Sequence, residues 1–436
     1  MHYLIQPSTI SDAIVGIPGD KSISHRAIML GSIAAGQTSV SGFLAGDDCV
    51  ATMAAFRQMG VEIEQTTATE LEIHGVGLRG LQAPAMDIDL GNSGTAMRLL
   101  AGVMAGQQFA ATLIGDESLT SRPMQRIITP LSRMGAEIES HEGRPPLTIR
   151  GNEQLEPIDY ELPVASAQVK SSILLAGLYA KGRSTVVEPA PTRDHTERML
   201  RAMGAEVDTS NGRISLYGLQ TLHGCPIHVP GDLSSAAFVM LAALLAENSD
   251  VLIRNVGINP TRSGVIDILQ AMGARIALEN PRILGKEPAA DIRVHSSELH
   301  GIVVDSGLVS LAIDEFPVLF VAAAAAIGKT VFSGLAELRV KESDRISAMA
   351  DGLRALGVEV EESRDGAVVH GGRFGAGQVQ SFGDHRIAMS LAIAATIAGG
   401  PVTVHDVSAV ETSFPGFVSC LQDIGVDIAC HEGESV

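Results

Sequence analysis

A short phrase with a glycine between apolar residues occurs six times along the chain and divides it into units of similar length. The phrases read MGVEIE, MGAEIE, MGAEVD, MGARIA, LGVEVE and IGVDIA. Their glycines, 68 to 84 residues apart, are Gly60, Gly135, Gly204, Gly273, Gly357 and Gly425. This spacing indicates that one unit of roughly 70 residues is repeated. Each glycine suits the left-handed cap that ends a helix, and the alternating residues after it suit a strand with one solvated face.

Each unit also contains a segment that is apolar on almost every face. The six segments begin at Ser24, Gly94, Ser166, Ser234, Glu315 and Asp384. A helix that is apolar all round is buried, so we expect these helices in the middle of each domain. The neighbouring strands alternate apolar and polar residues, as strands do in sheets with one face in water. The pattern therefore predicts an α/β (α+β) fold with helices inside and sheets outside.

Two identical Pro-Gly-Asp tripeptides divide the six units into two sets of three. They lie at 18–20 and 230–232, and each follows an expected strand and precedes an expected Ser-capped helix. We interpret them as the points at which the chain crosses between two domains. One domain would comprise residues 20–231, and the other residues 1–19 together with 232–436. The alternative is that the tripeptides are equivalent turns inside one continuous solenoid.

The chain of 436 residues is long enough for two domains with their own cores. Aromatic residues make up 3% of it and Trp is absent, so Ala, Leu, Ile, Val and Met must fill those cores. Four cysteines show no CxxC pair and no metal-ligand spacing: Cys49, Cys225, Cys420 and Cys430. Reduced thiols in a cytoplasmic protein are the expectation. The first residues lack a signal-peptide pattern and the apolar runs are too short to span a bilayer, so we expect no membrane association.

The formal charge of −19 disfavours nucleic acid as a partner, because such binding depends on a positive field over an extended face. Cations nevertheless recur at the starts of expected helices. On the buried helices these are Lys21, Arg26, Arg98 and Arg386, and on the second, surface helices they are Arg122, Arg193, Lys341 and Arg345. If all repeats point the same way, these cations and the helix N-termini converge on a cleft between the domains and form an anion site. Taken singly, each is more often an ordinary surface charge.

Carboxylates are the expected proton carriers. Asp314 precedes the fifth buried helix, and Glu342 lies in the cationic segment KESDR. An acid among cations has its ionised form favoured by charge and disfavoured by burial, so it can exchange a proton near neutral pH. Helix capping would explain both positions as well.

Two glycine-rich motifs do not meet the requirements of nucleotide-binding loops. GVGLRG at 75–80 is not followed by a helix pattern, and GIPGDKS at 16–22 lacks a glycine directly before its lysine. His25, His195 and His385 each stand beside Arg or Asp in a motif, and we interpret them as structural side chains rather than general bases.

Eight motifs spread over the whole chain together resemble the 5-enolpyruvylshikimate-3-phosphate synthase family. They are PGDKSISHR (18–26), LGNSGTAMR (90–98), SRPM (121–124), SAQVKS (166–171), TRDHTERML (192–200), IDEFP (313–317), KESDRI (341–346) and DHRIAM (384–389). The resemblance implies the enolpyruvyl transferase fold, with two domains of three βαβαββ repeats each. It also implies transfer of the enolpyruvyl (carboxyvinyl) group of phosphoenolpyruvate to the 5-hydroxyl of shikimate 3-phosphate, through a tetrahedral intermediate and with release of phosphate. No metal or organic cofactor is implied, and glyphosate would compete with phosphoenolpyruvate.

The same motifs imply roles for individual residues. The catalytic residues would be Asp314, Glu342 and Lys21. Shikimate 3-phosphate would bind to Lys21, Ser22, Arg26, Ser166, Ala167, Gln168, Arg193, Asp314 and Lys341. Phosphoenolpyruvate would bind to Lys21, Gly94, Arg122, Gln168, Arg345 and Arg386. Asp314 would take the 5-hydroxyl proton, and Glu342 would protonate the methylene carbon.

Two positions depart from the family pattern, and two other functions are possible. Many members carry a lysine of the phosphoenolpyruvate pocket just before a Thr-Phe-Pro-type motif, whereas this chain reads ETSFP, with Glu411 in that region. TRDHTER (192–198) has no tyrosine to stack on shikimate, so Arg193 would take that place. One alternative is UDP-N-acetylglucosamine enolpyruvyl transferase, whose loop carries a reactive cysteine where this chain has Ser-Arg-Pro at 121–123. The other is a non-catalytic phosphate- or RNA-binding repeat protein, which the net charge and the scarcity of aromatic residues disfavour. The resemblance also implies a monomer.

Overall fold

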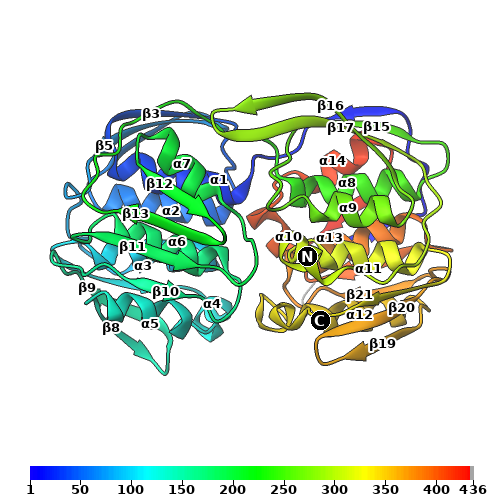
Figure 1. Cartoon of the computed structure of the whole chain (residues 1–436). Coiled ribbons are helices and arrows are strands. Elements are labelled where there is room, and N and C mark those ends of the chain that lie inside the picture. The colour runs from blue at the N-terminus through cyan, green and yellow to red at the C-terminus, as the bar shows by residue number, and fades with distance from the viewer. Residues whose placement is uncertain (433–436) are drawn as a thin grey trace. The chain divides into compact units, whose positions relative to one another are not determined.

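The computed structural model describes residues 1–432, which form two compact units (Figure 1). Unit 1 contains residues 1–18, 230–282 and those from 288 onward. Unit 2 contains residues 19–229 together with 283–287. The stretch 283–287 is the tip of a hairpin whose strands otherwise belong to Unit 1, and nothing in the sequence pattern indicated its place.

Short strands and helices alternate along Unit 2. Its strands are β3 (Ala35–Ser41), β4 (Glu62–Thr67), β5 (Glu70–Val76), β6 (Ile88–Asp89), β7 (Ala110–Ile114), β8 (Glu137–His141), β9 (Arg144–Arg150), β10 (Asp159–Glu161), β11 (Arg183–Val187), β12 (Val207–Ser210), β13 (Arg213–Tyr217) and β14 (Ile227–His228). Its helices are α1 (Lys21–Ile33), α2 (Asp47–Gln58), α3 (Gly94–Ala105), α4 (Glu117–Ser121), α5 (Gln125–Arg133), α6 (Ala167–Gly177) and α7 (His195–Ala202). The strands form sheets in the orders β14-β3-β5-β4, β6-β7-β9-β8 and β10-β11-β13-β12.

Unit 1 is built in the same way. Its strands are β1 (His2–Ile5), β2 (Ala13–Val15), β15 (Asp250–Gly257), β16 (Arg275–Leu284), β17 (Glu287–His295), β18 (Lys329–Phe332), β19 (Val360–Ser363), β20 (Gly366–His370), β21 (Gly377–Gln380), β22 (Val402–His405) and β23 (Ile428–His431). Its α-helices are α8 (Leu233–Leu245), α9 (Gly264–Ala271), α10 (Val309–Ala312), α11 (Phe316–Ala325), α12 (Arg345–Ala355), α13 (His385–Thr396) and α14 (Phe417–Asp423), and its 3-10 helices are η1 (Ser306–Leu308), η2 (Ala336–Val340) and η3 (Ser408–Thr412). The sheets are ordered β16-β17-β15-β2, β18-β20-β19 and β21-β22-β1-β23.

Five of the six sheets of the described residues follow one scheme. In the sheet β6-β7-β9-β8, β6 and β7 are parallel, and β9 pairs antiparallel with both β7 and β8. A buried helix joins the two parallel strands and a second helix precedes the hairpin, which gives the order βαβαββ. The sheet β18-β20-β19 departs from it, because isolated bridges from His300 to Ile327 and from Val303 to Val331 stand in place of its first strand. The fold is thus the mixed α/β repeat architecture that was predicted.

Three sheets include a strand from a distant part of the chain. β14 pairs in parallel with β3, so that Ile227 lies opposite Val40. β1 pairs antiparallel with both β22 and β23, and β2 runs parallel to β15. Each unit is therefore closed by pairing between its first and its last segments.

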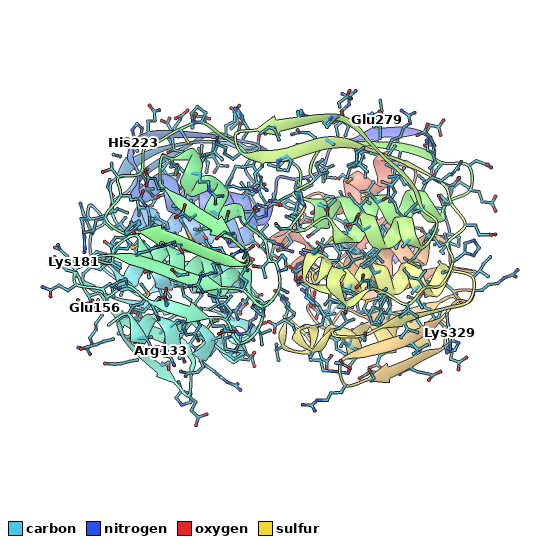
Figure 2. All side chains as sticks on the ribbon, in the orientation of Figure 1. Arg133, Glu156, Lys181, His223, Glu279 and Lys329 are labelled. Carbon is cyan, nitrogen blue, oxygen red and sulfur yellow. The ribbon has the colours of Figure 1, made fainter. Side chains whose placement is uncertain are left out.

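The six helices that are apolar on every face lie inside the units, as predicted. In α1 every residue from Ile23 to Ile33 is buried, and α3, α6, α8, α11 and α13 are buried along almost their whole length. The strands alternate buried and exposed residues, as β9 does. Charged side chains such as Arg133, Lys181 and Lys329 point away from the core (Figure 2). Sheets with one wet face therefore enclose a layer of central helices.

Glycine and aspartate mark the ends of the repeated helices. The six repeat glycines have φ between +86° and +102°, a left-handed conformation that would strain a side chain, so the predicted C-caps are confirmed. The helices after the two Pro-Gly-Asp tripeptides are capped by Asp20 and Asp232, not by the predicted serines. Each carboxylate accepts a hydrogen bond from the first turn, from Ile23 N at 2.9 Å and from Ser234 N at 2.8 Å. An acid at this place also complements the positive end of the helix.

Candidate active site

In Unit 2, the predicted substrate-binding residues lie at the N-termini of the buried helices. Lys21 is the first residue of α1 and Gly94 the first of α3. Ser166 caps α6, and its hydroxyl accepts from Val169 N at 3.4 Å. The residues beside these positions are half-buried: Ser22, Ala167 and Gln168. The helix ends present backbone N–H groups and positive dipole ends, which favour an anion.

Arg26, one turn into α1, is buried and held by three neighbours. Its Nε donates to Thr196 Oγ1 at 2.7 Å, its Nη1 to the Ser22 carbonyl at 2.9 Å and its Nη2 to Ser171 Oγ at 2.8 Å. The Thr196 hydroxyl donates in turn to Ser171 Oγ at 2.8 Å. Burial lowers the pKa of Arg26 to about 10, while Glu197 acts in the opposite direction. The side chain is therefore a fixed cation at neutral pH.

Lys21 and His25 have neighbours that the motifs did not indicate. Lys21 forms an ion pair with Asp48 of α2. The Nδ1 of His25 lies 2.8 Å from Thr52 Oγ1. Burial holds the pKa of His25 well below its ordinary value, and the charges of Lys21 and Arg26 act in the same direction. A buried neutral imidazole with a hydroxyl partner fits the structural interpretation of His25.

Two arginines flank Gly94. Arg98 Nη1 donates to Gln168 Oε1 at 2.5 Å, and Arg122 Nη2 donates to Asn92 Oδ1 at 2.5 Å. A Cβ placed on Gly94 would lie 3.1 Å from the Nη1 atoms of both arginines. Arg122 follows the short helix α4 and precedes α5, so it does not open the second helix as predicted. The bare backbone of Gly94 therefore faces two guanidinium groups at a helix N-terminus.

The loop that carries Arg193 is anchored by a buried lysine. Lys170 Nζ lies 3.2 Å from Glu188 Oε1 and 2.8 Å from Glu197 Oε1, and it donates to the Thr192 carbonyl at 3.3 Å. The Thr192 hydroxyl donates to Glu188. Burial raises the pKa of Glu188, although Lys170 counteracts this effect. These contacts fix the residue directly before Arg193, and no role for Lys170 was predicted.

In Unit 1, Arg345 begins α12 and lies among three carboxylates. Its Nε donates to Asp384 Oδ2 at 2.7 Å and its Nη2 to Glu342 Oε2 at 2.6 Å. Its Nη1 donates to Asp314 Oδ1 at 3.4 Å. Burial lowers the pKa of Arg345, but the acids, Asp384 foremost, outweigh it and raise the pKa above its ordinary value. Burial acts to raise the pKa of Asp384, but the Arg345 guanidinium outweighs this effect. The pKa of Asp384 is therefore below its ordinary value.

Asp314 lies in the short connection between α10 and α11 and faces two cations. Its Oδ1 accepts from Lys341 Nζ at 3.2 Å and from Arg345 Nη1 at 3.4 Å. Lys341 directly follows η2 and does not begin a helix, which differs from the prediction. Glu342 comes next in the chain. The structure thus brings both predicted proton carriers to one guanidinium, and hydrogen bonds to cations fix the orientation that acid–base chemistry needs.

The acids that hold the cations were missed in the sequence. Asp384 caps α13 by accepting from Arg386 N at 2.8 Å, so it contacts both predicted phosphoenolpyruvate-binding arginines of Unit 1. Asp384 is the first residue of the motif DHRIAM, and this position in a motif could have indicated its role from the sequence. Asp48, the partner of Lys21, lies in no motif that was singled out.

Glu411, which lies in the region where the family pattern would have a lysine, is exposed in η3. Burial is the main cause of the raised pKa of the Tyr3 phenol and the Cys430 thiol, and Glu411 adds to both. The segment before Phe414 and Pro415 therefore carries an exposed acid in η3.

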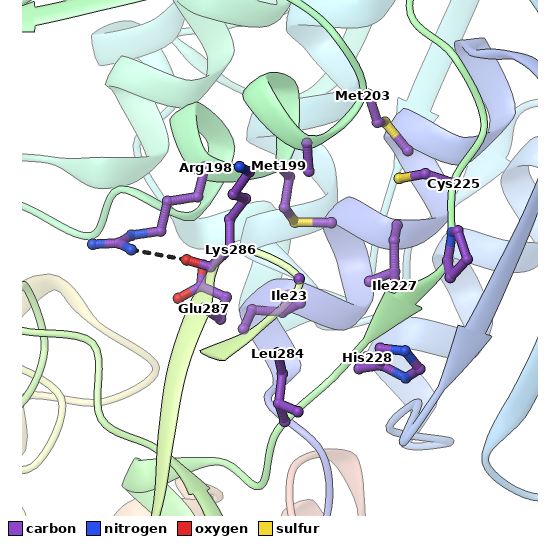
Figure 3. Close-up of a pocket in the computed structure, with 13 residues that line it drawn as sticks. Ile23, Arg198, Met199, Met203, Cys225, Ile227, His228, Leu284, Lys286 and Glu287 are labelled. Atoms are coloured by element: carbon purple, nitrogen blue, oxygen red, sulfur yellow. Dashed lines mark hydrogen bonds between the residues drawn. The ribbon is translucent and has the colours of Figure 1, made fainter. Parts of the chain in front are cut away.

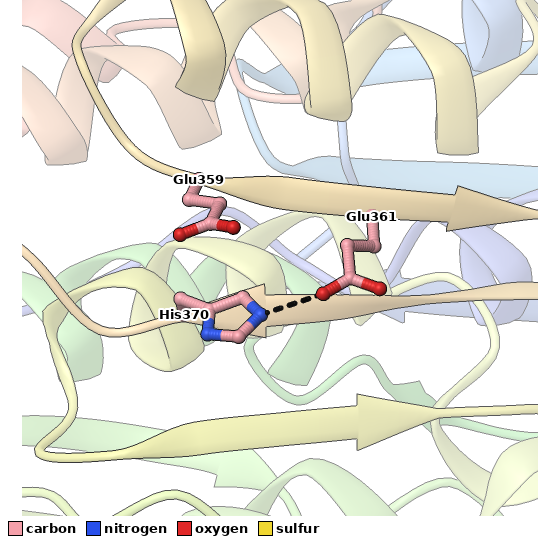
Figure 4. Close-up of side chains that lie close together, drawn as sticks. All are labelled: Glu359, Glu361 and His370. Carbon is pink, nitrogen blue, oxygen red and sulfur yellow. Dashed lines mark hydrogen bonds and ion pairs between the residues drawn. The ribbon is translucent and has the colours of Figure 1, made fainter.

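One group of possible metal ligands occurs among the described residues, on an exposed face of Unit 1 (Figure 4). Glu359, Glu361 and His370 have ligand atoms within 4.8 Å of one another. Glu361 Oε1 lies 3.0 Å from His370 Nε2, across the strands β19 and β20. A cross-strand pair accounts for this proximity, and no predicted substrate-binding residue belongs to the group.

Solved structures of other proteins share this fold over nearly the whole chain. The enolpyruvyl transferase NikO from Streptomyces tendae matches with a TM-score of 0.80 and 17% identity, over 98% of both chains. EPSP synthase from Acinetobacter baumannii matches with a TM-score of 0.88 and 50% identity, over 99% of this chain and 100% of that one. The fold is that of the enolpyruvyl transferases.

Sequence comparison narrows this class. The family model of EPSP synthase (3-phosphoshikimate 1-carboxyvinyltransferase) matches residues 5–421. The 3-phosphoshikimate 1-carboxyvinyltransferase of Methylococcus capsulatus is 57% identical over 415 residues, covering 95% of each chain, and that of Nitrosococcus oceani is 52% identical over 437 residues, covering 100% of this chain and 97% of the relative. The chain belongs to the EPSP synthase family, as its motifs indicated. Within residues 1–432, no helix combines the length and the apolar character that a membrane crossing requires.

Proposed function

We propose that this chain transfers the enolpyruvyl group of phosphoenolpyruvate to the 5-hydroxyl of shikimate 3-phosphate and releases phosphate. Membership of the family over residues 5–421 supports the reaction. The structural observation that carries the chemistry is the pair of carboxylates, Asp314 and Glu342, on the one buried guanidinium of Arg345. The reaction is a step of the shikimate pathway to chorismate and the aromatic amino acids.

The first step is an addition that needs one proton donor and one acceptor. Glu342 protonates the methylene carbon of phosphoenolpyruvate, and cationic character develops at the neighbouring carbon. The 5-hydroxyl oxygen bonds to that carbon while Asp314 takes the hydroxyl proton, which yields a tetrahedral intermediate. Lys341, hydrogen-bonded to Asp314 at 3.2 Å, is placed to orient the shikimate hydroxyls.

The second step is an elimination. The Glu342 carboxylate takes a proton back from the new methyl group, the carbon–carbon double bond re-forms, and the carbon–oxygen bond to phosphate breaks, with its electron pair leaving on the phosphate. Cations around the leaving group stabilise this charge. They are Lys21, Arg122, Arg345 and Arg386. The lack of a side chain at Gly94 allows the anion to approach the N-terminus of α3 closely.

Shikimate 3-phosphate takes the remaining predicted residues of Unit 2. These are Ser22, Arg26, Ser166, Ala167, Gln168 and Arg193. The three hydrogen bonds that hold Arg26 and the buried anchor of the Arg193 loop support this assignment, because a fixed cation binds a phosphate with little loss of side-chain entropy. We also propose that the chain acts as a cytoplasmic monomer. Light scattering of the purified protein tests its oligomeric state.

The test of the reaction is phosphate release from purified protein given phosphoenolpyruvate with shikimate 3-phosphate. Each substrate alone is the control. A second assay with UDP-N-acetylglucosamine as the acceptor tests the alternative reaction. Phosphate release with the sugar nucleotide and not with shikimate 3-phosphate would overturn the proposal.

A further inference from the structure

The tip of the hairpin β16–β17 belongs to Unit 2, although both of its strands continue in Unit 1. The turn at 285–286 is made by Gly285, whose φ of +63° is readily adopted only without a side chain, and Lys286. The chain thus enters Unit 2 a second time through a stretch of five residues, 283–287. So short an excursion depends on specific contacts within Unit 2.

Apolar contacts surround one side of the tip (Figure 3). Leu284 lines a small recess together with Ile23 of α1, Met199 of α7, Met203 directly after α7, and Ile227 of β14. These side chains lower the local dielectric constant, which strengthens polar contacts beside them.

The polar contacts of the tip are made with α7. Arg198 Nη1 donates to the Lys286 carbonyl at 2.9 Å. Glu287 Oε1 lies 2.8 Å from His195 Nδ1, and both side chains are buried. Among the residues that the structure describes, His195 Nε2 has no hydrogen-bond partner, so Glu287 is the group that orients the ring. Burial raises the pKa of Glu287, but His195 and Arg198 outweigh it and lower the pKa below its ordinary value.

His195 connects this pair to the proposed substrate-binding cations. It is the first residue of α7 and stands two residues after Arg193 and one before Thr196. Thr196 accepts the Nε–H of Arg26 at 2.7 Å. The first turn of α7 therefore directly follows one cation, Arg193, and braces another, Arg26, and Glu287 holds that turn.

We propose that Glu287 is a positioning residue for the shikimate 3-phosphate subsite, and that it acts through His195 on the first turn of α7 and thereby on Arg26 and Arg193. The inference rests on the proposed function, which assigns shikimate 3-phosphate to those two arginines. Gly94 begins α3 and Arg122 follows α4, so these phosphoenolpyruvate residues lie on other elements than α7, and Glu287 should affect the two substrates unequally.

The experiment compares Glu287→Ala, Glu287→Gln and the wild type. The control is Glu279→Gln, on the same hairpin but in Unit 1, where the exposed Glu279 lies 3.9 Å from Arg293 Nη1. We expect Glu287→Ala to raise the Michaelis constant and the dissociation constant for shikimate 3-phosphate about tenfold, because one anchoring buried contact is lost. The Michaelis constant for phosphoenolpyruvate at saturating shikimate 3-phosphate should change less than about twofold. Glu287→Gln keeps an acceptor oxygen and should stay within about threefold of the wild type.

A parallel rise of both Michaelis constants would overturn the proposal. So would a lower melting temperature with unchanged affinity for shikimate 3-phosphate, because the tip would then only stabilise the fold. If the alanine variant does not fold, calorimetric binding of shikimate 3-phosphate to the glutamine variant decides the matter, and unchanged affinity together with an unchanged Michaelis constant overturns the proposal. A wild type that binds shikimate 3-phosphate without releasing phosphate contradicts the proposed reaction alone. A wild type that does not bind it overturns both proposals.

Discussion

Arg345 and Asp384 form a pair in which Nε lies 2.7 Å from Oδ2 and Nη2 lies 3.3 Å from Oδ1. The exposed fractions of the two residues are 2% and 0%. Since Asp384 also caps α13, one carboxylate joins the starts of two helices in Unit 1. Removing one member of such a pair leaves a buried charge without its partner, which costs more than losing an exposed ion pair.

Asp384→Ala should therefore lower the free energy of unfolding by about 3–5 kcal/mol. Urea unfolding followed by circular dichroism measures this change. Asp351→Ala is the matched control, because Asp351 is exposed and pairs with Arg354 on the same helix, α12, at 3.1 Å. The control should have little effect. Equal losses in the two variants would contradict the stabilising role of the buried pair.

Asp314→Asn should retain substrate binding and lose about 10²- to 10⁴-fold in turnover, the usual range for a positioned acid or base. Asparagine keeps the shape and an acceptor oxygen for Lys341 and Arg345, but it cannot take the hydroxyl proton. Steady-state kinetics with both substrates provides the measurement. The control is Asp305→Asn, at an exposed cap of η1 that accepts from Gly307 N at 2.8 Å. Turnover near that of the wild type would remove Asp314 from the mechanism.

Gly94→Ala should raise the inhibition constant of glyphosate much more than the Michaelis constant of phosphoenolpyruvate. The new Cβ would lie 3.1 Å from the Nη1 atoms of Arg98 and Arg122, so the ends of these side chains must shift. Glyphosate is slightly longer than phosphoenolpyruvate, so it is expected to tolerate this loss of space less than the substrate does. Gly16→Ala is the control, because no atom lies within 4 Å of a Cβ at that position. A parallel change of both constants, or an insensitive wild type, would refute this account of the pocket.

The stability of the protein should depend on His25 below neutral pH. The folded-state pKa of His25 is lower than its ordinary value of 6.5, chiefly through burial. The unfolded chain then binds the proton more readily, so the stabilisation is present above pH 6.5 and is lost as the pH falls towards the folded-state pKa.

Between pH 7 and about 5, the free energy of unfolding of the wild type should fall more steeply than that of His25→Gln, by at most about 1.4 kcal/mol per pH unit. Thermal or urea unfolding at a series of pH values gives the two slopes. His74→Gln, at an exposed position of β5, should behave like the wild type. Identical slopes for wild type and His25→Gln would show that His25 is not the responsible group.

Much of the fold and the choice of candidate site residues could be predicted from the sequence, because the signals are local. A left-handed glycine such as Gly135 ends its helix whatever the rest of the chain does. Helices that are apolar on every face, such as α8, have to be buried. Motifs such as KESDRI and DHRIAM indicated Arg345 and Arg386 by their place in the repeat.

The partners of those residues were decided by the tertiary structure, since they come from segments far apart in the chain. Asp384 meets Arg345 across 39 residues, Thr196 meets Arg26 across 170, and Glu287 meets His195 across 92. The pairing of β14 with β3 and of β1 with β22 closes each unit in the same way. Periodicity specifies which face of a segment is buried, because that depends on neighbours a few residues away. Which distant side chain meets that face depends on how all the segments pack together, and only the folded chain determines this.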